Sequence, residues 1–582
     1  MCRRTLDGDG AADRIRRLSL HRCLLAPSPD RGHAGIGYDL PVAETRTDRL
    51  RYPCRNQPKP AMRGSFPAPR GPRDGIRIRR PNVHRSELLH QAQDALKLAI
   101  PRAQADPSRP AYHFRAPAQR MNDPNGPIFH RGWHHIFYQT NPLTDITKPF
   151  GTNFWGHARS RDLVNWEHLP FALIPDHASG EFGCWSGTVG VNGEGNLVLL
   201  YTSVPDRQDR GRIPFQQRAA IGDEKDRFFT PYDGNPILAL DDHLRLPGGP
   251  TMDPTWRDPY LWVHRGRTFM TVGMCGEEAG SPLFEAADSS LTRWAYKGSM
   301  CPVSAECPNF FPLGRHWVYL YSPFDAVEYR VGDFDADTPL FTELDGGIVD
   351  HGCRDWNGFY ASNVHAAPDG RQILHGWVRG FEEGHGWNGC LALPRELALD
   401  DDLVLRQSPI RELQSLRGPE QRVSGMMLDN ARQPLPDITG SQLELRVRLQ
   451  RLSAESCGIR LRTEANGDGG IAIGLSDAGL IVDEQPAVPL ADENSDLHIF
   501  LDRCVVEVFA DGGRVAYTRT IPQDLWGTGV TVWSQGGVAV LDQLSGWTIN
   551  AADIRWPNPG RSSAVPPEVS QKNRLRETRP AC

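Results

Sequence analysis

Four acidic residues occupy the same kind of place in this sequence, directly ahead of a short strand rich in aromatic residues. They are Asp123, Asp258, Glu306 and Asp355. Carboxylates accept hydrogen bonds from neighbouring hydroxyls, and aromatic faces cover the C–H side of a sugar ring. Crowded carboxyl groups also raise one another's pKa, so that a protonated acid can stand beside an ionised nucleophile. Such a pair is what the hydrolysis of a glycosidic bond requires.

The segments behind these acids share one pattern: a strand, a turn that contains glycine, and a second strand. A further copy follows Trp185 and Ser186 in place of an acid. A hairpin repeated about every 50 residues predicts a β-propeller, in which the innermost strand of each blade lines one channel. A large β-sandwich with coincidental spacing is the alternative. The five segments begin, at intervals of 60, 72, 49 and 52 residues, at Pro127, Gly187, Pro259, Pro308 and Tyr360.

The character of the chain changes after Pro409. Apolar Leu443, Leu445 and Val447 alternate with charged Glu444 and Arg446. Alternation of this kind predicts an antiparallel sandwich of two sheets. We therefore expect an all-β chain: a catalytic five-bladed propeller over residues 105–410, a β-sandwich over 415–552 and a flexible tail over 553–582.

The N-terminal region has a different composition. Residues 1–85 hold 18 Arg and one Lys against eight acidic residues, so they carry +11 while the remainder carries -17. We expect a disordered leader, or sequence upstream of the true start codon. No apolar stretch of roughly 7–15 residues follows Met1, so no signal peptide is predicted and a cytoplasmic location is expected. A helix over 86–104 leads into the catalytic domain, with Ser86 as its N-cap and Pro101 as its stop signal.

The overall composition excludes several classes of protein. The 582 residues are 39% hydrophobic and 23% charged, which is typical of two or three globular domains. No stretch approaches about eighteen apolar residues, and the mild acidity gives no reason to expect a nucleic acid partner. Twelve scattered cysteines without a Cys-x-x-Cys pair are expected to be reduced thiols. The absence of zinc spacings and nucleotide-binding loops predicts no metal and no other cofactor.

Taken singly, each of these motifs has a plain structural explanation. Asp-Pro-Asn-Gly at 123–126 is more often a turn than a nucleophile. Arg257 beside Asp258 could form a surface ion pair, and Cys307 is expected to be a small packing residue. Only their joint placement at successive strand starts makes coincidence improbable.

Seven short motifs follow one another along the chain. They are Met-Asn-Asp-Pro-Asn-Gly at 121–126, Phe154-Trp155-Gly156-His157, Trp185-Ser186-Gly187, Arg257-Asp258-Pro259, Glu306-Cys307-Pro308, Phe359-Tyr360-Ala361 and Leu393-Pro394-Arg395-Glu396-Leu397. In this order they resemble glycoside hydrolase family 32, the family of invertases, levanases and inulinases. The stretch from Leu501 to Phe509 resembles the strand signature of that family's C-terminal sandwich. The resemblance covers about residues 105–550.

The resemblance implies a five-bladed propeller followed by a sandwich, and a retaining double displacement on β-fructofuranosides. Asp123 would be the nucleophile, Glu306 the acid and base, and Asp258 the group that stabilises the transition state. Asp355 would reach toward the leaving group and Trp377 would form an aromatic wall. The positions that would bind substrate are Asn122, Gln139, Trp155, Trp185, Ser186, Arg257, Asp355 and Trp377.

Two positions depart from the family pattern. Arg120 stands where the family usually has Trp, which is expected to alter the rim of the channel but not the catalytic acids. Trp185 stands where Phe is common, a conservative change for stacking on a sugar.

The activity we expect is the release of fructose from sucrose, and from fructo-oligosaccharides, levan or inulin. The partner would be a small molecule or oligosaccharide with a β-fructofuranosyl unit; the sequence does not predict the oligomeric state. A fructosyltransferase with the same residues and a non-catalytic carbohydrate-binding propeller are the alternatives. A relative that acts on arabinan would lack the signature at 501–509.

Overall fold

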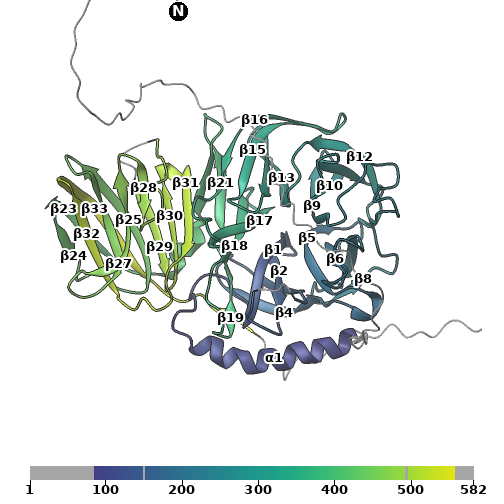
Figure 1. Ribbon diagram of the computed structural model, residues 1–582, viewed down its shortest axis with the longest axis horizontal. Coiled ribbons are helices and arrows are strands. Elements are labelled where there is room, and N and C mark those ends of the chain that lie inside the picture. Colours follow the sequence, from purple (N-terminus) through teal and green to yellow (C-terminus); the bar gives the residue numbers. More distant parts are fainter. Residues whose placement is uncertain (1–83, 148–150, 492–495, 557–582) are drawn as a thin grey trace, which may run out of the picture. The chain divides into compact units, whose positions relative to one another are not determined.

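The computed structural model describes residues 84–147, 151–491 and 496–556. The expected leader over 1–85 and the expected tail over 553–582 lie outside these residues, except at their inner ends. The described part consists mostly of strands, with one α-helix and three short 3-10 helices (Figure 1). In this part of the chain no helix is long and apolar enough to cross a membrane. The 3-10 helices are η1 (His177–Ser179), η2 (Arg411–Leu416) and η3 (Asp511–Gly513).

Helix α1 (Arg85–Ala105) lies within one residue of the predicted range 86–104 at each end, but the predicted end signals differ. Its N-cap is His84, and no side chain caps it, so the expected cap by Ser86 is wrong. Pro101 lies inside the helix instead of ending it. The apolar face continues beyond the proline to Ala103, which is fully buried. Packing of this last turn offsets the hydrogen bond that proline cannot donate.

Five sheets, whose neighbouring strands are antiparallel except for two short pairings, follow one another along the first part of the chain. The first has the order β19 (Trp387–Asn388), β1 (Gln119–His130), β2 (Trp133–Asn141), β3 (Phe154–Ser160), β4 (Trp166–Leu173) and β34 (Ile554–Arg555). The second has the order β5 (Gly183–Val191), β6 (Leu197–Val204), β7 (Gln216–Gly222) and β8 (Phe229–Pro231). The third has the order β12 (Trp294–Cys301), β11 (Ser281–Ala286), β10 (Arg267–Gly273) and β9 (Arg257–His264).

The fourth and fifth sheets repeat this plan. The fourth has the order β13 (Glu306–Leu313), β14 (His316–Ser322), β15 (Glu328–Asp335) and β16 (Leu340–Ile348). The fifth has the order β17 (Gly358–Ala366), β18 (Gln372–Arg379), β21 (Arg395–Leu399) and β22 (Leu405–Pro409), with β20 (Cys390–Leu391) also paired to β18. Each of the five segments found in the sequence forms the hairpin of the first two strands of one sheet.

The first strands of the five sheets contact one another in a closed cycle. β1 contacts β5, β5 contacts β9, β9 contacts β13, β13 contacts β17, and β17 contacts β1 again. Figure 1 shows these strands gathered around a common centre. Residues at the starts of these strands are therefore brought together although they lie far apart in the sequence.

Two further sheets make up the C-terminal part. The larger has the order β23 (Arg417–Asp429), β33 (Val538–Ile549), β25 (Gln442–Arg451), β29 (Leu497–Asp502), β30 (Val505–Ala510) and β31 (Val515–Thr520). The smaller has the order β24 (Arg432–Pro434), β32 (Gly529–Gln535), β26 (Ser456–Thr463), β27 (Gly469–Ser476) and β28 (Gly479–Val482). Leu445 and Val447 of β25 are buried while Arg446 is exposed, which confirms the alternation. Glu444 is the exception, buried in an ion pair with Arg417 and a hydrogen bond to His498.

A group of fully buried charges joins the C-terminal sheets to the rest of the chain. His113 contacts Asp502 at 2.8 Å and Glu507 at 3.0 Å, and Arg395 contacts Glu507 at 2.8 Å and Asp350 at 3.0 Å. Burial alone lowers the pKa of His113, but the two carboxylates outweigh it and raise the pKa to about 9. Asp502 and Glu507 lie in the 501–509 signature, so that signature encodes a contact between sheets.

Candidate active site

Every first strand carries a β-bulge at the residues that the sequence singles out. The register with the partner strand shifts at Asn122–Asp123 in β1, at Ser186 in β5, at Asp258–Pro259 in β9 and at Cys307–Pro308 in β13, with a matching shift after Tyr360 in β17. Asp258 and Cys307 have positive φ angles of 64° and 48°. A bulge re-aims side chains away from regular alternation, which is why bulges occur beside active sites.

The carboxylate of Asp123 is held through both of its oxygens. Oδ1 accepts a hydrogen bond from Asn122 Nδ2 at 3.0 Å. Oδ2 accepts from Gln139 Nε2 at 3.1 Å and from Ser186 Oγ at 2.5 Å. Burial raises the pKa of Asp123, the bonds from Ser186 and Asn122 oppose that rise, and the nearby Glu306 carboxyl adds to it. The donors thus favour the ionised form that a nucleophile needs.

Asp258, in the third sheet, is held by residues of the second and fourth sheets. Its backbone N–H donates to Thr202 Oγ1 at 2.9 Å, and its Oδ2 accepts from the backbone N–H of Cys307 at 3.0 Å. The Cys307 sulfur is 3.7 Å from Asp258 Oδ2 and 3.8 Å from Asp123 Oδ2, so the thiol packs between the two carboxyl groups. Burial raises the pKa of Asp258 to about 7, against the opposing charge of Arg257.

Residues of the two neighbouring sheets, the third and the fifth, hold the carboxyl group of Glu306 in place. Arg257 donates to Oε1 from Nη2 at 2.8 Å and from Nε at 3.2 Å. Tyr360 donates its hydroxyl to Oε2 at 2.7 Å. The Glu306 side chain keeps 19% exposure, whereas Arg257 keeps 9%. A carboxyl group that is held in place yet open to solvent can exchange a proton with a ligand and then with water.

The aromatic residues of the predicted site lie around these acids. Trp155 is fully buried and donates from Nε1 to the backbone carbonyl of Trp185 at 3.1 Å. The Trp185 ring faces the Arg210 guanidinium at 4.8 Å and the Arg257 guanidinium at 5.9 Å. Trp185 remains partly exposed, which leaves ring surface for a ligand.

Two predicted residues are less closely tied to the acids. Asp355 is exposed in the turn before β17, and within the described part of the chain no hydrogen bond joins it to Asp123, Asp258 or Glu306. Trp377 is buried in β18, with its ring 6.2 Å from that of Trp356.

Three polar contacts of the site were not predicted. Tyr360 was part of a quoted motif at a strand start, which was the available signal, but it was not chosen as a site residue. Asn153 donates to Gln139 Oε1, and Thr202 accepts from the backbone of Asp258. Neither of these two stands in a repeated position, so the sequence offered no signal for them.

Arg120, which stands where the family usually has Trp, has a buried side chain, with 1% of the residue exposed. The expected effect of the missing tryptophan on the rim of the channel stays a prediction. Nη2 donates to Asn122 Oδ1 at 2.9 Å, and Nη1 lies 3.5 Å from Asn153 Oδ1. A guanidinium group needs oxygen acceptors when it is buried, and these two amides supply them on the side away from solvent.

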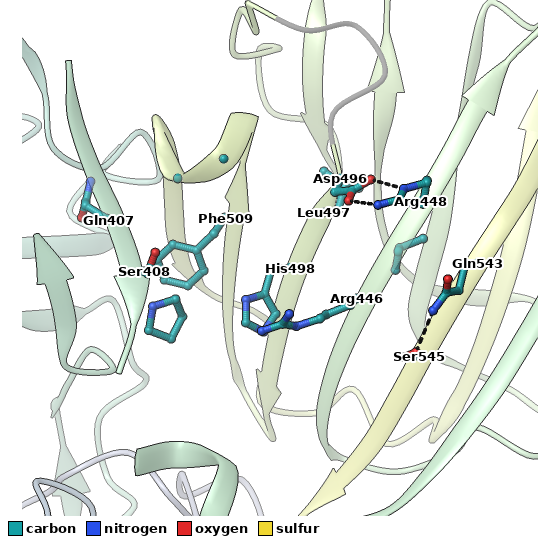
Figure 2. A pocket seen from close by; sticks show the side chains of 14 residues that line it. Gln407, Ser408, Arg446, Arg448, Asp496, Leu497, His498, Phe509, Gln543 and Ser545 are labelled. Carbon is teal, nitrogen blue, oxygen red and sulfur yellow. Dashed lines mark hydrogen bonds and ion pairs between the residues drawn. The ribbon is translucent and has the colours of Figure 1, made fainter. Parts of the chain in front are cut away.

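A separate hollow of about 450 Å³ lies between β22 and the larger C-terminal sheet. Figure 2 shows Gln407 and Ser408 on one side and Arg446, His498 and Phe509 on the other. None of the predicted site residues lines this hollow. The cluster of three acids at the strand starts is therefore the candidate active site.

Two models of protein families match the chain. One is described as the glycosyl hydrolases family 32 N-terminal domain and matches residues 113–409. The other is described as the glycosyl hydrolases family 32 C terminal and matches residues 412–548. The first contains all three clustered acids, and the second contains the 501–509 signature.

Individual proteins agree with these matches. A sucrose-6-phosphate hydrolase of Zymomonas mobilis is 31% identical over 518 residues, which cover 80% of this chain and 97% of that protein. A levanase of Bacillus subtilis is 30% identical, over 74% of this chain and 69% of that protein. The structure of a fructan 1-exohydrolase IIa variant from Cichorium intybus in complex with 1-kestose has a TM-score of 0.66 at 20% identity, covering 77% of this chain and 99% of that one.

Proposed function

This chain belongs to glycoside hydrolase family 32, and from that premise we propose how its residues release fructose from a β-fructofuranoside. Relatives named sucrose-6-phosphate hydrolase and levanase make the chain a fructose-releasing glycosidase. The observation that carries the assignment of roles is the meeting of three carboxyl groups at the bulged starts of β1, β9 and β13. We propose sucrose as the first substrate to test.

In the first step Asp123 attacks the anomeric carbon of the fructosyl unit. A bond forms between a carboxylate oxygen and that carbon, while the bond from the carbon to the leaving oxygen breaks. Glu306 gives its proton to the leaving oxygen, so that a neutral sugar departs. Arg257 and Tyr360 keep the carboxyl of Glu306 in place, because each of them holds a different oxygen.

In the second step Glu306 is a carboxylate and acts as the base. It takes a proton from water, whose oxygen attacks the anomeric carbon and releases Asp123. Asp258 hydrogen-bonds fructose hydroxyls and stabilises the positive charge that develops on the ring in both transition states. A retaining mechanism of this kind predicts that the carboxyl groups of Asp123 and Glu306 are about 5–5.5 Å apart.

We further propose that the five sheets are the blades of a propeller and that the two C-terminal sheets form a sandwich. The closed cycle of first strands supports the propeller. We propose domain limits of 105–410 and 415–552, which lie close to the limits of the two family matches. The remaining ligand positions, from Asn122 to Trp377, are proposed to hold the fructosyl ring or the leaving group.

The direct test is incubation of the purified protein with sucrose, with the products separated by chromatography over time. Hydrolysis gives equal amounts of glucose and fructose. Glucose in excess of fructose, together with new oligosaccharides, would instead reveal the transferase that the comparisons do not favour. Levan and inulin form the second arm of the test, and the anomer of fructose first released reports whether configuration is retained.

The roles of the acids are tested in the same assay. Asp123→Ala and Glu306→Gln are each expected to reduce kcat at least ~10²–10⁴-fold, because each removes a group that reacts. Both variants should unfold at nearly the wild-type temperature. Near-normal turnover by either folded variant would show that its role has been wrongly assigned.

A further inference from the structure

Arg120 stands at the head of two hydrogen-bond chains that end on the two oxygens of Asp123. Along the first chain Arg120 donates to Asn122, whose Nδ2 donates to Oδ1. Along the second Arg120 lies 3.5 Å from Asn153 Oδ1, Asn153 donates to Gln139, and Gln139 donates to Oδ2. The four residues that lead to Asp123 are each at most 5% exposed: Arg120, Asn122, Asn153 and Gln139.

The direction of both chains follows from the charge at each end. An amide placed between a cation and a carboxylate turns its oxygen toward the cation and its NH₂ group toward the carboxylate. Asn122 is held in this way between Arg120 and Asp123. The same order runs through Asn153 and Gln139, so one guanidinium fixes the orientation of three amides.

We propose that Arg120 is a positioning residue for the nucleophile: its buried guanidinium orients the amides that present N–H donors to Asp123. It acts on the carboxylate through these amides. The inference rests on the proposed role of Asp123 and goes beyond it, because it assigns a role to the position at which this chain departs from its family.

The charges around Asp123 make the contribution of Arg120 measurable. Glu306 from β13 and Asp258 from β9 face it as acidic groups, and the Cys307 thiol packs against it. Arg257 donates both of its hydrogen bonds to Glu306 to the same oxygen, Oε1. Burial raises the pKa of Asp123, the hydrogen bonds from Ser186 and Asn122 lower it, and the positive charge of Arg120 lowers it further. That charge persists although burial lowers the pKa of Arg120 itself to about 10.

Three variants separate the charge from the packing. Arg120→Met removes the charge and the donors, Arg120→Gln keeps a donor without the charge, and Arg120→Lys keeps the charge. Arg462→Met is the matched control, because Arg462 is a buried arginine of the sandwich that bonds to the backbone of Leu525 and touches none of the acids. The readouts are kcat, KM and the pH profile of kcat/KM with sucrose, beside thermal unfolding.

For Arg120→Met we expect the acidic limb of the profile to move to higher pH, because a charge that lowers the pKa of Asp123 is lost. We expect kcat to fall by up to about 10²-fold, because the nucleophile loses its orientation, while KM changes much less. Arg120→Gln should move the limb in the same direction, and Arg120→Lys should return it close to the wild-type position. The control should lower the unfolding temperature without moving the limb. If Arg120→Met fails to fold, the position of the acidic limb in Arg120→Lys is compared with that in Arg120→Gln, and this comparison tests the proposal.

Two outcomes would overturn the inference. If Arg120→Met and Arg120→Gln fold and keep the acidic limb and the kcat of the wild type, Arg120 only fills space in the interior. An equal shift in Arg462→Met would show that general destabilisation moves the limb. Asp123→Ala is measured in the same series: if it retains activity, the role of Asp123 and this inference fall together, whereas an inactive Asp123→Ala beside unaffected Arg120 variants rejects the inference alone.

Discussion

Replacing Arg395 by methionine is expected to weaken the junction between the fifth sheet and the C-terminal sheets. Arg395 is fully buried and contacts Glu507 at 2.8 Å, Asp350 at 3.0 Å and Gln407 Oε1 at 2.9 Å. Glu507 belongs to β30, whereas Arg395 begins β21, so this guanidinium connects the two parts of the chain. Methionine fills a similar volume but offers no donor and no charge.

The expected loss in the free energy of unfolding follows from the buried charges that remain in Arg395→Met. The buried group holds two cations, His113 and Arg395, against three carboxylates, Asp350, Asp502 and Glu507. Without Arg395 one buried cation would face three buried carboxylates. Removing one partner of a buried ion pair costs about 3–5 kcal/mol, because an uncompensated charge stays in a medium of low polarity. Arg395→Met is therefore expected to lower the free energy of unfolding by about that amount.

The assay is urea unfolding followed by circular dichroism, with an exposed ion pair as the control. Arg448 and Asp496 lie 2.8 Å apart, and both side chains are 57% exposed. Arg448→Met should cost only about 0–1 kcal/mol, because water screens the pair. Adding Glu507→Gln to Arg395→Met should restore part of the lost stability, since it removes one of the two carboxylates in excess of the remaining cation, His113. If Arg395→Met and Arg448→Met unfolded at the same urea concentration, the reasoning would be refuted.

Two further predictions concern the acid and the buried histidines. Tyr360→Phe removes the hydroxyl that holds Glu306 Oε2, so kcat should fall about tenfold while the unfolding temperature stays close to that of the wild type; an unchanged kcat would contradict this. Burial lowers the pKa of His135, His168 and His375 to about 3, below the 6.5 of the unfolded chain, so stability is lost as pH falls from 6.5 toward 3. In this pH range His375→Phe should reduce the slope of the unfolding free energy against pH by up to ~1.4 kcal/mol per pH unit. Urea midpoints measured at several pH values test this, and a slope equal to that of the wild type would contradict it.

The hairpins and the acids could be predicted from the sequence because their signals are local. A turn glycine between two apolar strands fixes a hairpin within about twenty residues, and the five hairpins are confirmed as the inner pairs of the five sheets. The stop signal at Pro101 was wrong because tertiary packing overrode it, although the predicted bounds 86–104 are within one residue of the helix. Pro101 is tolerated since the face beyond it is buried against the first sheet.

Contacts made by side chains at unrelated positions could not be predicted. For Arg120 the family pattern pointed only to the tryptophan that is absent at this position, and gave no information on the contacts of the arginine. Its acceptor Asn153 lies 33 residues away, outside every repeated motif. Asp502 and Glu507 stood out only as members of a signature, and their charge partners His113 and Arg395 come from segments more than 100 residues distant. The periodicity of the sequence predicts strands, but which charged side chains contact one another depends on the tertiary fold.

The placement of the acids explains why the active site needs the whole ring of sheets. Each acid belongs to one sheet, and residues of neighbouring sheets hold it in position. Asp123 is held from the second sheet, Asp258 from the second and fourth, and Glu306 from the third and fifth. The donors and acceptors concerned are Ser186 for Asp123, Thr202 and the Cys307 backbone for Asp258, and Arg257 and Tyr360 for Glu306. A small shift between two sheets that share such a contact therefore changes the geometry of an acid, so we expect contacts between sheets to contribute to the proposed catalysis as well as to stability.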